Sequence, residues 1–148
     1  MKFANDQRGA VLAEFALALM PMLLTFFGFV QFAQLATADL YVRHAAICAA
    51  RAAAVMQDAN NPGEHSPQQS GSEAAAEQAM GKWARSGLLG VPSVSITGGG
   101  TSGEFVSATV TVPVTCRVPL GKMLACGGST KSLSHTARFP AQGARYQE

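Results

Sequence analysis

Reactive residue types are sparse in this chain, so any chemistry would have to come from a few scattered side chains. The three histidines, His44, His65 and His135, are far apart and share no metal-ligand spacing. None stands in a Ser-His-Asp or Cys-His arrangement that the sequence can justify. The glycine run Gly98–Gly103 lacks the lysine and hydroxyl residue that follow in a phosphate-binding loop. We therefore expect no enzyme activity, no metal site and no cofactor.

The three cysteines offer a different chemistry, a disulfide. Cys116 and Cys126 would close a loop of 11 residues, which stabilises a domain by about 3 kcal/mol on the chain-entropy model. Such a bond requires an oxidising compartment, as for an exported domain. The sequence allows three pairings, because Cys48 could replace either partner. We favour Cys116 with Cys126, which leaves Cys48 as a small packed helix residue or an intermolecular bridge.

The most informative spacing lies near the N-terminus, where Gly9 and Ala10 are followed by Glu14 and Phe15. A cut after Gly9 would make Ala10 the new amino terminus and Glu14 the fifth residue. This arrangement resembles the class III signal of type IV pilins and pseudopilins, which a prepilin peptidase cuts on the cytoplasmic side. The resemblance implies that Glu14 pairs with the Ala10 ammonium of a neighbouring subunit, which would favour one axial register. The alternative is that Glu14 lies at the membrane interface, where the dipole of the helix N-terminus favours an acid.

The segment that must position these residues is a long apolar helix. Residues 15–38 contain no Asp, Glu, Lys or Arg, and a helix of about 24 residues is roughly 36 Å long, enough to span a bilayer core. Lys2 and Arg8 precede the span and favour a cytoplasmic N-terminus and an exported C-terminal domain. Ala36-Thr37-Ala38 is similar to a signal-peptidase site, but the apolar run before it is too long for an ordinary secretory signal.

Beyond the span, the pattern predicts an α+β fold with a long N-terminal transmembrane helix, a short helix and a small antiparallel sheet of about three strands. Alanine-rich sequence extends the first helix over residues 10–56, and a polar linker follows at 57–71. Ser70 and Glu73 form a capping box that places a second helix at the start of an exported domain, residues 72–148. Alternating patterns then predict strands at 93–97 and 106–115, and a last strand at 131–139 with Leu133, His135, Ala137 and Phe139 on one face. Pro113 predicts that the middle strand is at an edge there, or ends near it.

The order of these parts is similar to one family in particular, the TadE-like minor pseudopilins of the tight-adherence (Tad/Flp) pilus. The residues that carry the resemblance are Arg8-Gly9-Ala10-Val11-Leu12-Ala13-Glu14-Phe15-Ala16-Leu17, Pro21, Phe29, Phe32 and Ala50-Arg51-Ala52-Ala53. The resemblance covers residues 8–56 and implies a leader, 1–9, removed by a prepilin peptidase. It further implies a single-pass protein of the bacterial inner membrane with a periplasmic domain, whose partners are other pilins and the Tad inner-membrane platform.

Composition narrows the alternatives. Only 14% of the residues are charged, and 11 basic side chains stand against 9 acidic ones. Because a scattered net charge of +2 gives no basic face, we expect no nucleic-acid partner. The alternatives left open are a signal-anchored periplasmic or surface binding domain unrelated to filaments, and a pseudopilin of a type II secretion apparatus.

Overall fold

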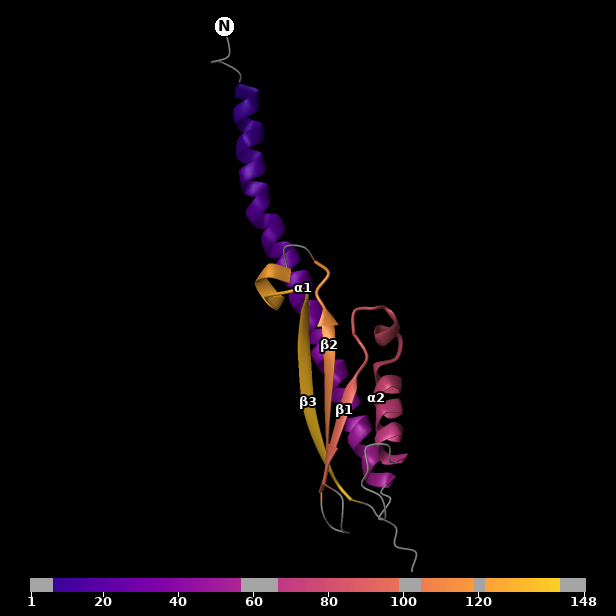
Figure 1. The fold of residues 1–148 in the computed structure, drawn as a ribbon. Coiled ribbons are helices and arrows are strands. Elements are labelled where there is room, and N and C mark those ends of the chain that lie inside the picture. Colours follow the sequence, from indigo (N-terminus) through magenta and orange to yellow (C-terminus); the bar gives the residue numbers. More distant parts are fainter. Residues whose placement is uncertain (1–6, 57–66, 99–104, 119–121, 142–148) are drawn as a thin grey trace, which may run out of the picture.

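The computed structural model describes residues 7–56, 67–98, 105–118 and 122–141, and it has the expected α+β fold. The helices are α1 (Gln7–Val55) and α2 (Pro67–Arg85), and a short π-helical segment, η1, covers Lys122–Cys126. The strands β1 (Ser93–Thr97), β2 (Phe105–Thr115) and β3 (Thr130–Pro140) form one antiparallel sheet in the order β1-β2-β3. Figure 1 shows the sheet and α2 beside the C-terminal half of α1, while the N-terminal half of α1 projects away from them.

Helix α1 is one continuous element of 49 residues, about 74 Å long at the usual rise. It continues through Pro21, whose missing N–H and ring are tolerated in apolar spanning helices. Alanine, the best helix former, dominates the second half. The expected continuation of the helix past the apolar span is therefore confirmed.

Helix α2 differs from the prediction at its start. It begins at Pro67, so Ser70 lies inside the helix and does not cap it, and the helix takes up the end of the stretch 57–71 expected as a linker. Proline is favoured in the first helical turn because its φ is already helical and the N–H that it lacks would be unpaired there. The helix ends at Arg85, and Gly87 just after it has a φ of 69°, the left-handed conformation in which glycine commonly ends a helix.

The alternating pattern of the sheet reproduces the sequence prediction. Val106, Ala108, Val110 and Val112 of β2 are fully buried, whereas Ser107, Thr109 and Thr111, which alternate with them, lie on the outer face and are only partly buried. β2 is the central strand, but Pro113 lies beyond Ser93, where β1 begins and pairs with Thr111. Pro113 therefore has no partner residue in β1, and its missing N–H breaks no hydrogen bond to that strand. This agrees with the prediction that β2 is an edge strand at Pro113.

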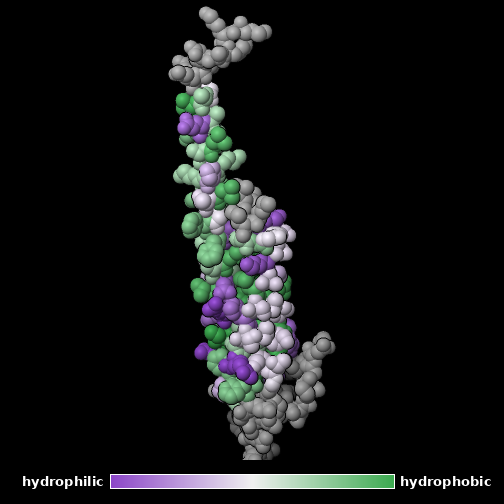
Figure 2. Space-filling view, turned by 90° about the vertical axis from the view of Figure 1, so that its left-hand side faces the viewer, coloured by the Kyte–Doolittle hydropathy of each residue, from purple (hydrophilic) through white to green (hydrophobic). Residues whose placement is uncertain are grey.

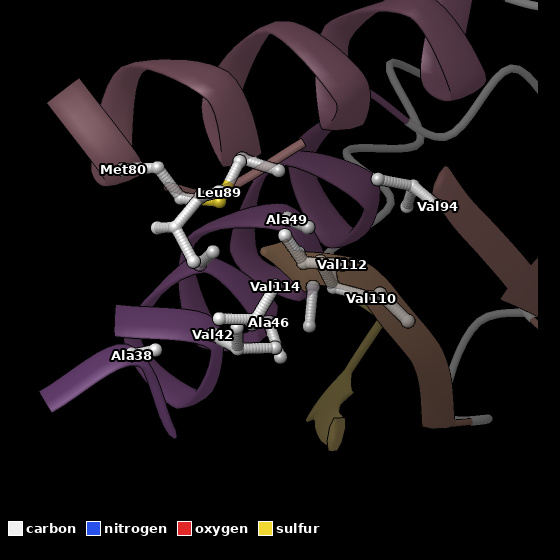
Figure 3. Packing of buried hydrophobic residues seen from close by; sticks show 14 of the residues in the cluster. Ala38, Val42, Ala46, Ala49, Met80, Leu89, Val94, Val110, Val112 and Val114 are labelled. Atoms are coloured by element: carbon white, nitrogen blue, oxygen red, sulfur yellow. The ribbon is translucent and has the colours of Figure 1, made fainter. Parts of the chain in front are cut away.

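The core forms where α1, α2 and the sheet meet (Figure 3). Helix α1 contributes mostly alanines to it, and the sheet and α2 contribute larger side chains. The buried residues labelled in Figure 3 are Ala38, Val42, Ala46, Ala49, Met80, Leu89, Val94, Val110, Val112 and Val114. Small side chains on α1 allow its backbone to approach its neighbours closely, and the volume is filled by valines and by Met80.

Candidate assembly site

The first part of α1 is not packed against the described part of the domain. Every side chain from Gly9 to Phe26 is exposed, and the large ones include Leu12 at 69% and Phe15 at 64%. The helix is long and apolar enough to cross a membrane, and none of its most apolar 18-residue window is buried. Exposed apolar surface on this scale requires an apolar environment, either lipid or other helices.

The residues singled out at the N-terminus lie in this exposed part. Gly9, Ala10 and Glu14 are in the first turns of α1, and Ala10 and Glu14 are separated by four residues, which places them on one side of the helix. Within the described residues, Glu14 makes no hydrogen bond or ion pair. A carboxylate at the edge of an apolar stretch is costly unless it stays in the interface or meets an opposite charge. The subunit itself supplies no such charge among the described residues.

A shallow hollow of about 310 Å³ lies further along the same half of α1. Gly28 is one of its lining residues, with Leu24, Thr25, Phe29 and Phe32 around it. Thr25 Oγ1 donates to the carbonyl of Met22 at 2.8 Å, so its polar atom is satisfied within the helix. Small residues such as Gly28 are the places where apolar helices approach one another closely.

The domain begins to cover α1 at Gln31, the first buried side chain of the helix. Gln31 is fully buried, and its Oε1 accepts a hydrogen bond from Val118 N–H at 3.2 Å. Leu35 and Ala38 are also buried under the domain. The expected span, residues 15–38, therefore overlaps the packed half by a few residues. The stretch that contains no buried residue is 9–30, about 33 Å long.

The structure also brings together a polar cluster that the sequence did not reveal. His135 Nε2 of β3 lies 2.6 Å from Asp39 Oδ1 of α1, and Arg43 Nε lies 2.9 Å from Asp39 Oδ2. The pKa of Asp39 is lowered, mainly by the hydrogen bond from His135 and further by the positive charges of His135 and Arg43. Asp39 and His135 are 96 residues apart in sequence. In the sequence, the only sign of this contact was His135, a polar residue on the same strand face as Leu133 and Ala137.

The favoured cysteine pairing is present. Cys116 and Cys126 form a disulfide with a Cα–Cα distance of 6.6 Å, which ties the end of β2 to η1. Cys48 is a free thiol on α1, and its Sγ lies 3.7 Å from His44 Nε2. Within the described ranges, no group of three or more His, Cys, Asp or Glu side chains is placed to hold a metal ion.

Comparison of the chain with family models, with curated proteins and with solved structures finds no match. The functional assignment therefore depends on the residues and their geometry.

Proposed function

We propose that this protein is a minor pilin or pseudopilin that takes part in the assembly or initiation of a Tad-type adherence pilus, after cleavage following Gly9 by a prepilin peptidase. The single observation that carries the proposal is Glu14. It is a carboxylate without a partner among the described residues, four residues after Ala10, at the start of a helix whose residues 9–26 are all exposed.

The proposed mechanism is association through α1. Cleavage creates an ammonium group on Ala10, and the Glu14 carboxylate of an adjacent subunit pairs with it when the apolar helices pack side by side. A buried charge without a partner costs several kcal/mol, whereas a buried ion pair adds little net stability. The pairing therefore acts mainly by destabilising subunits that pack out of register. The large exposed side chains, such as Phe15 and Phe29, supply the apolar contact, and Gly28 allows close approach.

Burial of the helix between Gln31 and Ala38 supports cleavage at the leader over cleavage by an ordinary signal peptidase. A cut after Ala38 would remove Gln31 and Leu35, which are buried against the domain, together with the hydrogen bond to Val118. Cleavage after Gly9 removes no described core residue. A mature protein that keeps α1 also keeps its anchor, and before assembly the protein resides in the inner membrane with its domain in the periplasm. Its partners are other pilin subunits and the Tad inner-membrane platform.

The N-terminal sequence of the mature protein, purified from membranes of cells that carry the matching prepilin peptidase, tests this proposal. We expect Ala10 as the first residue, and Met1 in cells without the peptidase. Asp39 as the first residue would indicate an ordinary secretory signal. Met1 in both strains would indicate a simple signal anchor, and either result contradicts the proposal.

A further inference from the structure

The two edges of the sheet are treated differently by the rest of the molecule. At the outer edge of β1, α2 bonds to the main chain, because Gln69 Nε2 donates to the carbonyl of Val94 at 2.7 Å. At the outer edge of β3, by contrast, no hydrogen bond from any described residue reaches the main chain. β3 has 11 residues and β1 has five, so the longer of the two edges is the one that the described residues leave open.

The open edge presents a definable set of main-chain groups. Gly90 N–H donates to Pro113 at 2.7 Å and Thr115 N–H donates to Leu88 at 2.8 Å, so Pro113 and Thr115 direct their main-chain groups away from β3. Because this direction alternates along an antiparallel strand, the even-numbered residues of β2 bond to β3. The register then assigns the pairs Val112–Leu133, Val110–His135 and Ala108–Ala137 to the ladder between β2 and β3. The residues between these partners, Ser132, Ser134 and Thr136, direct their N–H and C=O groups outward.

The inner face beneath this edge is incompletely covered. Leu133, Ala137 and Phe139 of β3 are only partly buried, whereas the neighbouring valines of β2 are fully buried. On α1, Ile47 is 39% exposed, one turn from Arg43 and one turn from Arg51. An added strand would therefore gain apolar contacts as well as main-chain hydrogen bonds.

The charges around the edge are mostly basic. Arg51 lies over the Phe139 ring at 5.3 Å, and Lys131 and Arg138 belong to β3 itself. Arg43 and His135 already share Asp39, the one acid among the described residues on this side. Figure 2, which looks onto this side, shows hydrophilic patches between the apolar helix and the pale sheet. Pairing of β3 with β3 of a second copy would bring these basic groups together, which disfavours self-association here.

We propose that the outer edge of β3 is a docking site for an extended, acidic segment of a partner protein, which adds to the sheet as a fourth strand. Lys131 and Arg138 lie near the two ends of the edge, and the stretch between them, 132–137, contains no Lys or Arg to block pairing. The partner segment bonds to Ser132, Ser134 and Thr136, covers Phe139 with apolar side chains on the inner face, and places carboxylates on the outer face near Arg138. This docking does not depend on cleavage after Gly9 or on the pairing of Glu14.

Amide hydrogen exchange on the full-length protein in detergent micelles tests the docking. The probe is a synthetic heptapeptide that alternates valine and glutamate, and its control has lysine in place of each glutamate. In the free protein, the amides of Leu133 and His135 exchange slowly, and those of Ser132, Ser134 and Thr136 exchange fast. The acidic peptide should slow exchange at these three positions by about tenfold or more, and the lysine peptide should leave them unchanged.

Two sets of variants sharpen the test. Ser134→Pro removes an outward N–H without breaking the ladder to β2, so it should abolish protection by the acidic peptide, while Ser134→Ala should keep it. If Ser134→Pro fails to fold, the variant Arg138→Gln should weaken peptide binding by about tenfold. Arg117→Gln is its control, since Arg117 contacts Gly87 on the β1 side.

Three results would overturn the proposal. If both peptides, or neither, slow amide exchange at the edge of β3, the edge does not bind an acidic segment selectively. Protection of Ser132, Ser134 and Thr136 in the isolated protein at every concentration would show that a segment of the same chain covers the edge. Protection that grows with protein concentration would assign the edge to a second copy.

Discussion

Along α1, the residues before Gln31 and those after it differ in the size of the side chains they carry and in what covers them. The first half presents large residues such as Leu12, Met22 and Phe29, all at least two-thirds exposed. The second half buries small ones such as Ala45, Ala46 and Ala49. Both halves are rich in apolar residues, so the size and the burial of the side chains distinguish them, and the apolar content does not.

The difference shows what each half is shaped to contact. Bulky flexible side chains suit a surface that meets lipid or other subunits, where no fixed complementary shape exists within the chain. Alanines suit a seam already filled by the valines of β2 and by Met80. The most direct ways to test this contrast are substitutions that should affect one half and not the other.

The largest expected effect is that of Glu14→Ala on filament incorporation. Loss of one partner of a buried ion pair costs about 3–5 kcal/mol, so we expect incorporation to fall more than a hundredfold. Membrane insertion and the thermal stability of the domain should not change, because Glu14 contacts no described residue. Quantitative immunoblotting of sheared filaments and membranes measures both. Glu77→Ala, which removes an exposed carboxylate from α2, is the control, and normal incorporation of Glu14→Ala would refute the pairing.

The disulfide lies in the domain that packs on the second half of α1. Its loss should lower the stability of this domain and leave the exposed first half of α1 unchanged. Replacing both Cys116 and Cys126 by serine should destabilise the domain by about 3 kcal/mol. Denaturant unfolding followed by circular dichroism measures this difference. A reducing agent should reproduce the effect in the native protein and leave the double variant unchanged. Stability that is the same with and without the bond would contradict this account.

A matched pair of alanine substitutions compares the halves most directly. Ala49→Leu inserts a large side chain into a fully buried position facing the core, and overpacking costs about 1–3 kcal/mol. Ala16→Leu makes the same change where the helix is exposed, so the free energy of unfolding of the domain should stay the same. Equal losses for both variants would show that the first half is packed against something within the chain.

The smallest expected effect concerns Asp39 and pH. The folded-state pKa of Asp39 is lowered by His135 and Arg43, so its stabilising contribution is complete above the ordinary carboxyl value of 3.8 and is lost as pH falls through the lowered pKa. Asp39→Asn should therefore reduce stability at pH 6 by up to about 1 kcal/mol, the range of partly exposed ion pairs. The two proteins should converge as the pH falls below 3.8. Denaturant midpoints across pH 2.5–6 measure this convergence, and a constant difference would assign the effect to packing.

Much of the fold could be predicted because each local pattern has one dominant solution. The uncharged run and the alanines that follow it dictate a long helix, and alternation with period two dictates the three strands. The prediction for the start of α2 was wrong. Ser70 and Glu73 resemble a capping box, but Pro67 is equally suited to the first turn of a helix. Within the candidate site, Gly9, Ala10 and Glu14 were found by spacing, but their role in assembly stays a prediction.

The sequence by itself determined the apolar helix, the period-two strands and the unusual position of Glu14, because these depend on residue types that are close together in the chain. Tertiary structure alone decided where the domain meets the helix, since the burial of Gln31 depends on Val118, which is 87 residues away. It also decided that Asp39 meets His135, and that Gln69 bonds to the edge of β1 while no described residue bonds to the main chain at the outer edge of β3. Contacts of this kind depend on how elements pack, and no local pattern in the chain encodes them.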